Sequence, residues 1–143
     1  MGRLQLALNV SDIDEAVDFY SKLFAAAPAK RRPGYANFVI ADPPLKLVLF
    51  EGAGPPGSLN HLGVEVASTD EVAAATARLA GDGLETETQD QVACCYAVQD
   101  KVWVTGPDAR AWEIYTVLAD APTLACGTDT VADGGSAASA CGG

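Results

Sequence analysis

The chain has 143 residues, a formal net charge of −10 and hydrophobic residues at 49% of its positions. This length suits one domain with a proper core, and the acidic balance argues against nucleic acid and anionic membranes, which attract cationic surfaces. No apolar run reaches the roughly 18 to 20 residues of a membrane span, and the first residues lack the features of a secretory signal. We therefore expect a cytoplasmic protein, in which four cysteines favour metal binding, catalysis or redox chemistry over structural disulfides.

The first half of the chain begins with a predicted strand, LQLALNV, whose apolar residues alternate with period two. Ser11 or Asp12 then supplies the N-cap of a helix with apolar residues at helical spacing over residues 13–23. Extended runs follow in GYANFVIAD and LKLVLFEG, with a turn at Pro43-Pro44 between them. The stretch EGAGPPGSL is the predicted linker to the second half.

The second half repeats the pattern of the first at a shift of 56 residues, which superimposes residues 4–23 on residues 60–79. It has an alternating strand, a polar cap at Ser68 or Thr69 and an amphipathic helix, followed by the extended runs CCYAVQ, KVWVTG and AWEIYTV. Such a repeat means two copies of one supersecondary unit. Since neither copy can bury its sheet alone, the two sheets should combine around a concave face.

The predicted fold class is therefore α+β, with paired βαβββ modules. We expect a single domain over residues 1–119, with the modules at about 3–51 and 59–118. Residues 120–143 are rich in Gly, Ala and Ser and predict a flexible tail. The tail contains Cys126 and Cys141, which we interpret as free thiols, with accessory capture of thiophilic ions as the alternative.

Three polar side chains on predicted strands are candidate metal ligands. Gln5 and His61 occupy the same position in the two repeats, and a small residue two places later, Ala7 or Gly63, leaves space above the sheet. Glu113 lies in an otherwise apolar strand, where an unpaired charge is costly. An amide oxygen, an imidazole and a carboxylate resemble the two-His-one-carboxylate triad of non-haem iron enzymes, with Gln replacing one His.

A structural interpretation of these residues stays open, because a lone histidine is more often structural and an amide on a sheet face is common. The alternation also places Asn60 on the face opposite His61. Glu51 ends the matching strand of the first half and is expected to be solvated, while Leu47 or Val48 takes the place of Glu113.

The adjacent cysteines Cys94 and Cys95 allow two interpretations. They are inert buried thiols, or they chelate one thiophilic centre such as trivalent arsenic, Cd(II) or Hg(II). Adjacent residues of a regular strand point to opposite faces, so chelation requires a loop, a bulge or an irregular strand start. A disulfide between the two is unfavourable because it closes a strained ring.

Residues 3–118 resemble the vicinal oxygen chelate superfamily, which includes glyoxalase I, extradiol dioxygenases and the bleomycin and fosfomycin resistance proteins. Within it the chain is similar to the organoarsenical carbon-arsenic lyases and the related cadmium-induced proteins. The elements that carry the similarity are LQLALNV, FYSKLF, AKRRPGYANFVIADPPLKLVL, LNHLGVEV, CCYAVQDKVWVTGPD and WEIYTVLAD.

The resemblance implies an Fe(II)-dependent dioxygenase that cleaves the carbon-arsenic bond of trivalent organoarsenicals, such as methylarsonous acid or reduced aromatic arsenicals. Dioxygen is the co-substrate, and arsenite and an oxidised carbon fragment are the products. Carried over by position, Gln5, His61 and Glu113 hold the metal, while Cys94 and Cys95 bind the arsenic of the substrate. Tyr96, next to them in the sequence, is our own further candidate for substrate binding. Ni(II), Co(II) or Zn(II) are expected surrogates for iron, and the protein is expected to be a monomer or homodimer.

Several aromatic and basic residues also receive a predicted location. Candidates for an apolar pocket wall are Tyr96, Trp103, Tyr115, Tyr35 and Phe38, although most of them are expected to be core residues instead. Lys101, Arg31 and Arg32 are interpreted as surface charges. One rival function is a binding protein that sequesters Cd(II) or arsenite without turnover, and another is a different activity of the same superfamily, which fold alone does not distinguish.

Overall fold

The computed structural model describes residues 2–122, in which the order strand, helix and three strands occurs twice. The elements of the first half are β1 (Arg3–Val10), α1 (Ile13–Phe24), β2 (Lys30–Arg32), β3 (Tyr35–Ile40) and β4 (Leu45–Glu51). Those of the second half are β5 (Leu59–Glu65), α2 (Thr69–Gly81), β6 (Thr86–Cys94), β7 (Ala97–Thr105), a short 3₁₀ turn (Pro107–Ala109) and β8 (Ala111–Asp120). The predicted α+β class with paired βαβββ modules is confirmed. Cys126 and Cys141 lie outside the described residues.

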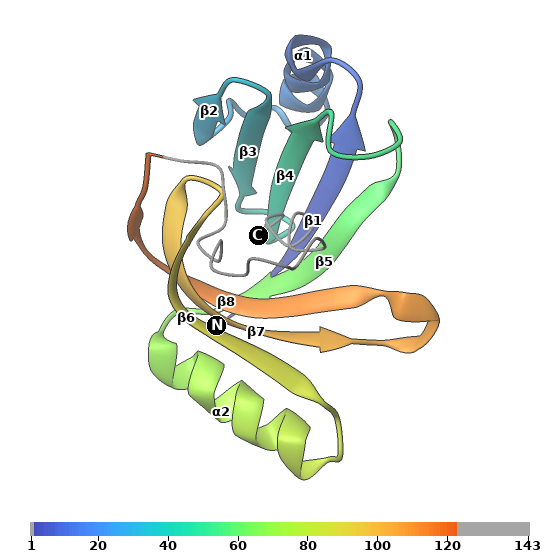
Figure 1. The fold of residues 1–143 in the computed structure, drawn as a ribbon. Helices are drawn as coiled ribbons and strands as arrows, with labels where there is room; N and C mark the ends of the chain where they lie inside the picture. Colours follow the sequence, from blue (N-terminus) through green and yellow to red (C-terminus); the bar gives the residue numbers. More distant parts are fainter. Residues whose placement is uncertain (1, 123–143) are drawn as a thin grey trace.

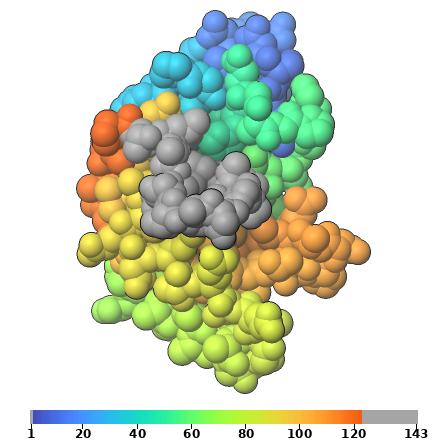
Figure 2. All heavy atoms as spheres, in the orientation of Figure 1, coloured from blue at the N-terminus to red at the C-terminus, as the bar shows by residue number. Residues whose placement is uncertain are grey.

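All eight strands form one mixed sheet in the order β2-β3-β4-β1-β5-β8-β7-β6. At its centre β1 and β5 are antiparallel, while β4 runs parallel to β1 and β8 parallel to β5. Figure 1 shows the sheet curling, with α1 beside the strands of the first half and α2 beside those of the second. In the space-filling view the first half forms the upper part of the visible face and the second half the lower part (Figure 2).

Both helices begin at one of the two residues predicted to cap them. The Asp12 side chain accepts a hydrogen bond from the Glu15 amide at 3.0 Å, and Ser68 accepts one from the Glu71 amide at 3.2 Å. Each cap satisfies a backbone N–H that has no partner within its helix. None of the helices among residues 2–122 is long and apolar enough to cross a membrane.

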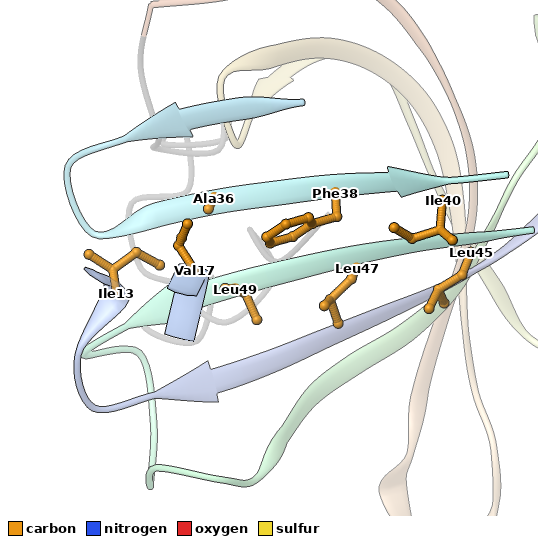
Figure 3. Close-up of a cluster of buried hydrophobic side chains, with 8 residues drawn as sticks. All are labelled: Ile13, Val17, Ala36, Phe38, Ile40, Leu45, Leu47 and Leu49. Carbon is orange, nitrogen blue, oxygen red and sulfur yellow. The ribbon is translucent and has the colours of Figure 1, made fainter. Parts of the chain in front are cut away.

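The main apolar core lies between α1 and one face of the first half-sheet (Figure 3). Its buried members are Ile13, Val17, Ala36, Phe38, Ile40, Leu45, Leu47 and Leu49. Full burial of one large aliphatic or aromatic side chain stabilises the fold by roughly 1.5–3 kcal/mol. Phe38 belongs to this core and is therefore not a pocket-wall residue, in agreement with the expectation that most of the aromatic candidates are core residues.

The strands of the second half differ from the prediction. CCYAVQ and KVWVTG are not two strands, because β7 runs without interruption from Ala97 to Thr105. The third strand is instead β6, whose sequence TETQDQVAC is too polar to show the alternation of a half-buried strand. Its position at the edge of the sheet explains this composition, since charged side chains on an edge strand oppose pairing with other chains.

Candidate functional site

The central strand pair relates the two halves by the symmetry that the repeat predicts. In the antiparallel register Gln5 faces Gly63, and Ala7 faces His61. Gly63 in turn pairs with Glu113 of β8, while Ala7 pairs with Val48 of β4. Val48 therefore takes the place of Glu113 in the first half, and Glu51 instead accepts a hydrogen bond from the backbone of α1.

The structure brings Gln5, His61 and Glu113 together on the concave face of the sheet. Gln5 Nε2 lies 2.7 Å from Glu113 Oε2 and 3.1 Å from His61 Nε2, and His61 Nε2 lies 2.9 Å from Glu113 Oε2. Their exposed fractions are 0%, 2% and 0%. Among residues 2–122 no three His, Cys, Asp or Glu side chains converge, so an amide must complete any three-ligand site here.

Gly63 provides the space in which these three side chains meet. A Cβ at this position would lie 2.9 Å from Glu113 Cγ and 3.2 Å from Gln5 Nε2. Real Cβ atoms do not approach another heavy atom at the first of these distances. The small residue predicted beside His61 is therefore required by the packing of its neighbours.

Lys101 was interpreted as a surface charge, and this is wrong, because the side chain is completely buried. Its Nζ donates to Glu113 Oε1 at 2.8 Å, and the same ammonium group lies 5.4 Å from the ring centroid of Trp103 and 5.9 Å from that of Tyr115. Burial alone raises the pKa of Glu113, but the charge of Lys101, followed by the interactions with His61, outweighs it and lowers that pKa to about 2. Glu113 is thus ionised at neutral pH.

Tyr115 fixes the other end of the Gln5 amide by donating its hydroxyl proton to Gln5 Oε1. Burial and the nearby charge of Glu113 hold the pKa of Tyr115 well above its usual value, so the phenol keeps this proton. The amide nitrogen of Gln5 is consequently directed at Glu113 and His61.

Asn60 is also placed differently from the prediction. The register between β1 and β5 shifts after Ala7, so that Leu8 pairs with Leu59 and Asn60 has no partner across the pair. Such a bulge turns a side chain away from the regular alternation. Asn60 Oδ1 therefore lies 3.0 Å from His61 Nδ1, although adjacent residues of a regular strand point to opposite faces.

The donor set of the three converging residues fits a divalent cation. An amide nitrogen carries no lone pair, so its contact with His61 Nε2 is a hydrogen bond only if Nε2 is the acceptor. Nε2 and the ionised Oε2 of Glu113 then face each other at 2.9 Å as two acceptors, which a cation between them would stabilise. For Gln5 to act as a third ligand, its amide must rotate to present Oε1, with Nε2 then donating to the Tyr115 hydroxyl.

The two cysteines occupy the turn between β6 and β7. Cys94 is the last residue of β6, and the two turn residues, Cys95 and Tyr96, have φ angles of 56° and 64°. Two consecutive residues with positive φ are the geometry of a type I′ hairpin turn. The turn breaks the alternation, as chelation requires, and brings the two Sγ atoms to 3.6 Å. Cys94 is disulfide-bonded in the structure, and this distance shows that Cys95 is not its partner.

Both cysteines are buried on the same concave face as the three polar side chains. They pack with Ala7, Tyr35, Val48 and Phe50, and Ala7 is the cross-strand neighbour of His61. The Tyr96 ring lies against this cluster, 5.2 Å from the ring of Tyr35. The Trp103 ring lies 5.4 Å from the imidazole of His61.

A cavity of about 170 Å³ adjoins Cys95 on this face. Its lining includes three basic residues, Arg3, Lys30 and Lys46, and one acidic residue, Glu65, which pairs with Arg3 at 2.7 Å. Another lining residue is Gln99, whose Oε1 is buried without a hydrogen-bond partner among the described residues. A cavity of this size is large enough for a benzene ring, and its polar wall suits a polar substituent.

Comparisons with known proteins show the family of this chain. The glyoxalase/bleomycin resistance protein/dioxygenase superfamily model matches residues 2–114. The chain belongs to this superfamily. It is 62% identical over 127 residues to the cadmium-induced protein CadI of Mycobacterium tuberculosis H37Rv, covering 89% of this chain and 84% of that protein. It is 56% identical over 147 residues to the trivalent organoarsenical cleaving enzyme of Thermomonospora curvata, covering 99% and 97%.

Two solved structures share the fold at low sequence identity. Homoprotocatechuate 2,3-dioxygenase of Arthrobacter globiformis superimposes with a TM-score of 0.58 at 20% identity, covering 84% of this chain and 37% of that one. The Mn(II)-bound glyoxalase of Novosphingobium aromaticivorans superimposes with a TM-score of 0.60 at 15% identity, covering 86% and 42%. At these sequence identities the structural similarity shows the fold only. The chemistry must be inferred from the residues of the site.

Proposed function

We propose that this protein is a dioxygenase that uses Fe(II) and dioxygen to cleave the carbon-arsenic bond of trivalent organoarsenicals. The observation that carries the proposal is that two adjacent cysteines and a buried Gln-His-Glu set lie on the same concave face of one sheet. The similarity to a trivalent organoarsenical cleaving enzyme over nearly the whole of both chains supports it.

Cys94 and Cys95 would capture the substrate. Their thiolates displace the oxygen ligands of trivalent arsenic and hold it by two sulfur atoms, which makes the later step effectively intramolecular. The turn that presents both sulfur atoms supports this role. Because Cys94 is disulfide-bonded in the structure, the protein must be reduced before it binds substrate. The cavity beside Cys95 would receive the organic substituent.

Gln5, His61 and Glu113 would hold the metal ion, which supplies the electron transfer that activates dioxygen. Lys101 occupies Oε1 of Glu113 and so directs Oε2 to the metal. The dry surroundings of Glu113 exclude water from the reacting groups. A protein set with three ligands leaves further coordination positions for dioxygen and substrate.

The cleavage of methylarsonous acid by dioxygen is balanced without an external reductant. One methylarsonous acid and one dioxygen give one arsenous acid and one formaldehyde, with carbon, arsenic, hydrogen and oxygen in balance. The carbon-arsenic bond breaks, and the methyl carbon is oxidised to the aldehyde by dioxygen. The methyl compound is therefore a better first substrate than an aromatic arsenical, whose conversion to a phenol needs two additional electrons.

The test uses protein that has been reduced, freed of reductant, stripped of metal by a chelator and reloaded with Fe(II) under nitrogen. On admitting air with excess methylarsonous acid, arsenite and formaldehyde should form in equal amounts over many turnovers. Glu113→Gln should lose turnover, whereas Glu15→Gln, which alters an exposed carboxylate of α1 outside the cavity beside Cys95, should retain it. Equal turnover under strict anaerobiosis would contradict the proposal.

A second candidate is sequestration of thiophilic ions without turnover. The observation that favours it is the identity of 62% to a protein named for its induction by cadmium, together with the same two thiols. The assay above separates the two functions. A sequestering protein retains arsenic in a fixed ratio to its thiols and produces no formaldehyde.

A further inference from the structure

The imidazole of His61 is connected to the turn between the two halves by a chain of side-chain hydrogen bonds. Asn60 Oδ1 lies 3.0 Å from His61 Nδ1, and Asn60 Nδ2 donates to Asn9 Oδ1 at 3.0 Å. Asn9 Nδ2 donates to Ser58 Oγ at 2.9 Å, and the Ser58 hydroxyl donates to the backbone carbonyl of Pro55 at 2.6 Å. The chain thus ends on a backbone carbonyl.

This carbonyl fixes the direction of every bond in the chain. A carbonyl oxygen only accepts, so Ser58 must give its single proton to Pro55 and accept from the amide nitrogen of Asn9. Asn9 then presents its oxygen to Asn60 Nδ2, and Asn60 is left with its oxygen toward His61. His61 Nδ1 must therefore carry a proton.

Backbone contacts hold this series of hydrogen-bonded side chains in place. The Asn9 amide donates to the Ser58 carbonyl at 2.9 Å, and the Gly57 amide donates to the Asn9 carbonyl at 2.8 Å. Gly54 allows the linker to approach, because a Cβ there would lie 2.7 Å from Asn9 Nδ2. The bulge at Asn60 completes the arrangement by bringing its side chain to the side of His61.

We propose that Asn60, Asn9 and Ser58 are positioning residues that keep the proton of His61 on Nδ1 and reserve the Nε2 lone pair for a metal ion. In this tautomer the contact from Gln5 Nε2 to His61 Nε2 at 3.1 Å is a hydrogen bond that Nε2 accepts. A metal-binding histidine commonly donates its second ring N–H to an oxygen acceptor, which orients the ring and selects its tautomer. This inference rests on the proposed metal site but not on the reaction that the metal would support.

The chain contains one histidine, so a ¹⁵N nuclear magnetic resonance spectrum of histidine-labelled protein reports on His61 alone. In the metal-free wild type we expect the neutral ring to carry its proton on Nδ1. Asn60→Leu removes the acceptor, and the proton should move to Nε2, where Glu113 accepts it. Asn60→Asp keeps an acceptor and should retain the wild-type tautomer. Ser58→Ala removes the anchor, so that the amides can reverse and a mixture of tautomers should appear.

Metal affinity gives a second measurement that does not depend on turnover. Spectroscopic Co(II) titration should show binding about 10- to 100-fold weaker in Asn60→Leu, the range typical of removing such a hydrogen bond, and near wild type in Asn60→Asp. Thr76→Val is the matched control for Ser58→Ala, because Thr76 also donates its hydroxyl to a backbone carbonyl, within α2, and it should change neither measurement. A wild-type ring protonated on Nε2, or Asn60→Leu with unchanged tautomer and affinity, would overturn the inference. Failure of the carbon-arsenic assay alone would leave it standing.

Discussion

The ammonium group of Lys101 lies 2.8 Å from one carboxylate oxygen of Glu113, and neither side chain has exposed surface. Two opposite charges without solvent stabilise each other only as a pair, since desolvation of either one alone is costly. The two carboxylate oxygens therefore have different partners. Lys101 donates to Oε1, whereas Gln5 and His61 contact Oε2. The metal-free site is thereby held together by a cation that belongs to the protein.

Replacing Lys101 with Met should destabilise the metal-free protein by about 3–5 kcal/mol, the usual cost of leaving a buried charge without its partner. Ni(II) should stabilise this variant more than the wild type, because the metal ion replaces the missing positive charge. Urea denaturation with and without Ni(II) measures both effects. Lys22→Met, which breaks an exposed pair with Asp18, should change stability by less than about 1 kcal/mol. Equal stability of the two variants would refute the role of the buried pair.

The stability of the metal-free protein should depend on pH through Glu113. Its pKa of about 2 in the folded protein lies below the ordinary value of 4.5, so the folded state binds this proton less readily than the unfolded state. The resulting stabilisation is complete above about pH 4.5 and is lost as the pH falls toward 2, with a magnitude on the order of 3 kcal/mol. Glu113→Gln should be less stable at neutral pH and should show a flatter dependence across this acid range. Parallel acid dependences in the two proteins would contradict the assignment.

Gly63→Ala should disrupt the site by contact alone. The added methyl group would lie 2.9 Å from Glu113 Cγ, so the carboxylate must move and Co(II) affinity should fall by tenfold or more. Gly81→Ala is the matched control, because a Cβ at this last residue of α2 meets nothing within 4 Å. It should leave metal binding unchanged and stabilise the protein slightly, since alanine is favoured over glycine in helices. Tight Co(II) binding by Gly63→Ala would show that the close packing is not essential.

The repeat explains how much of the site the sequence can predict. Because strand alternation and the 56-residue shift are local patterns, they identified Gln5 and His61 as equivalent positions and Gly63 as the small residue between ligands. Glu113 stood out as a charge in an apolar strand. These features depend only on the period of a strand, which the sequence carries directly.

Lys101 and Asn60 were not identified, for two different physical reasons. The burial of Lys101 depends on its pairing with a residue of the neighbouring strand β8, a long-range contact that no local pattern contains. The orientation of Asn60 depends on a bulge, which shifts the register by one residue and reverses the alternation beyond it. An in-strand lysine close to an in-strand glutamate was a usable signal for the first. No comparable signal preceded the second.

The last prediction concerns Cys94 and Cys95 and the capture of the substrate by reduced protein. Two sulfur atoms 3.6 Å apart on one turn can bind the same arsenic atom, and the second bond forms at high effective concentration. Cys94→Ser and Cys95→Ser should each weaken binding of methylarsonous acid by about 10²- to 10⁴-fold while leaving Co(II) affinity within about twofold of wild type. Thr76→Val, a substitution within α2 and away from this turn, is the control and should bind as wild type does. Retained arsenic, measured by mass spectrometry after desalting, distinguishes the variants. If Cys95→Ser retained as much arsenic as Thr76→Val, the capture site would not be the β6–β7 turn.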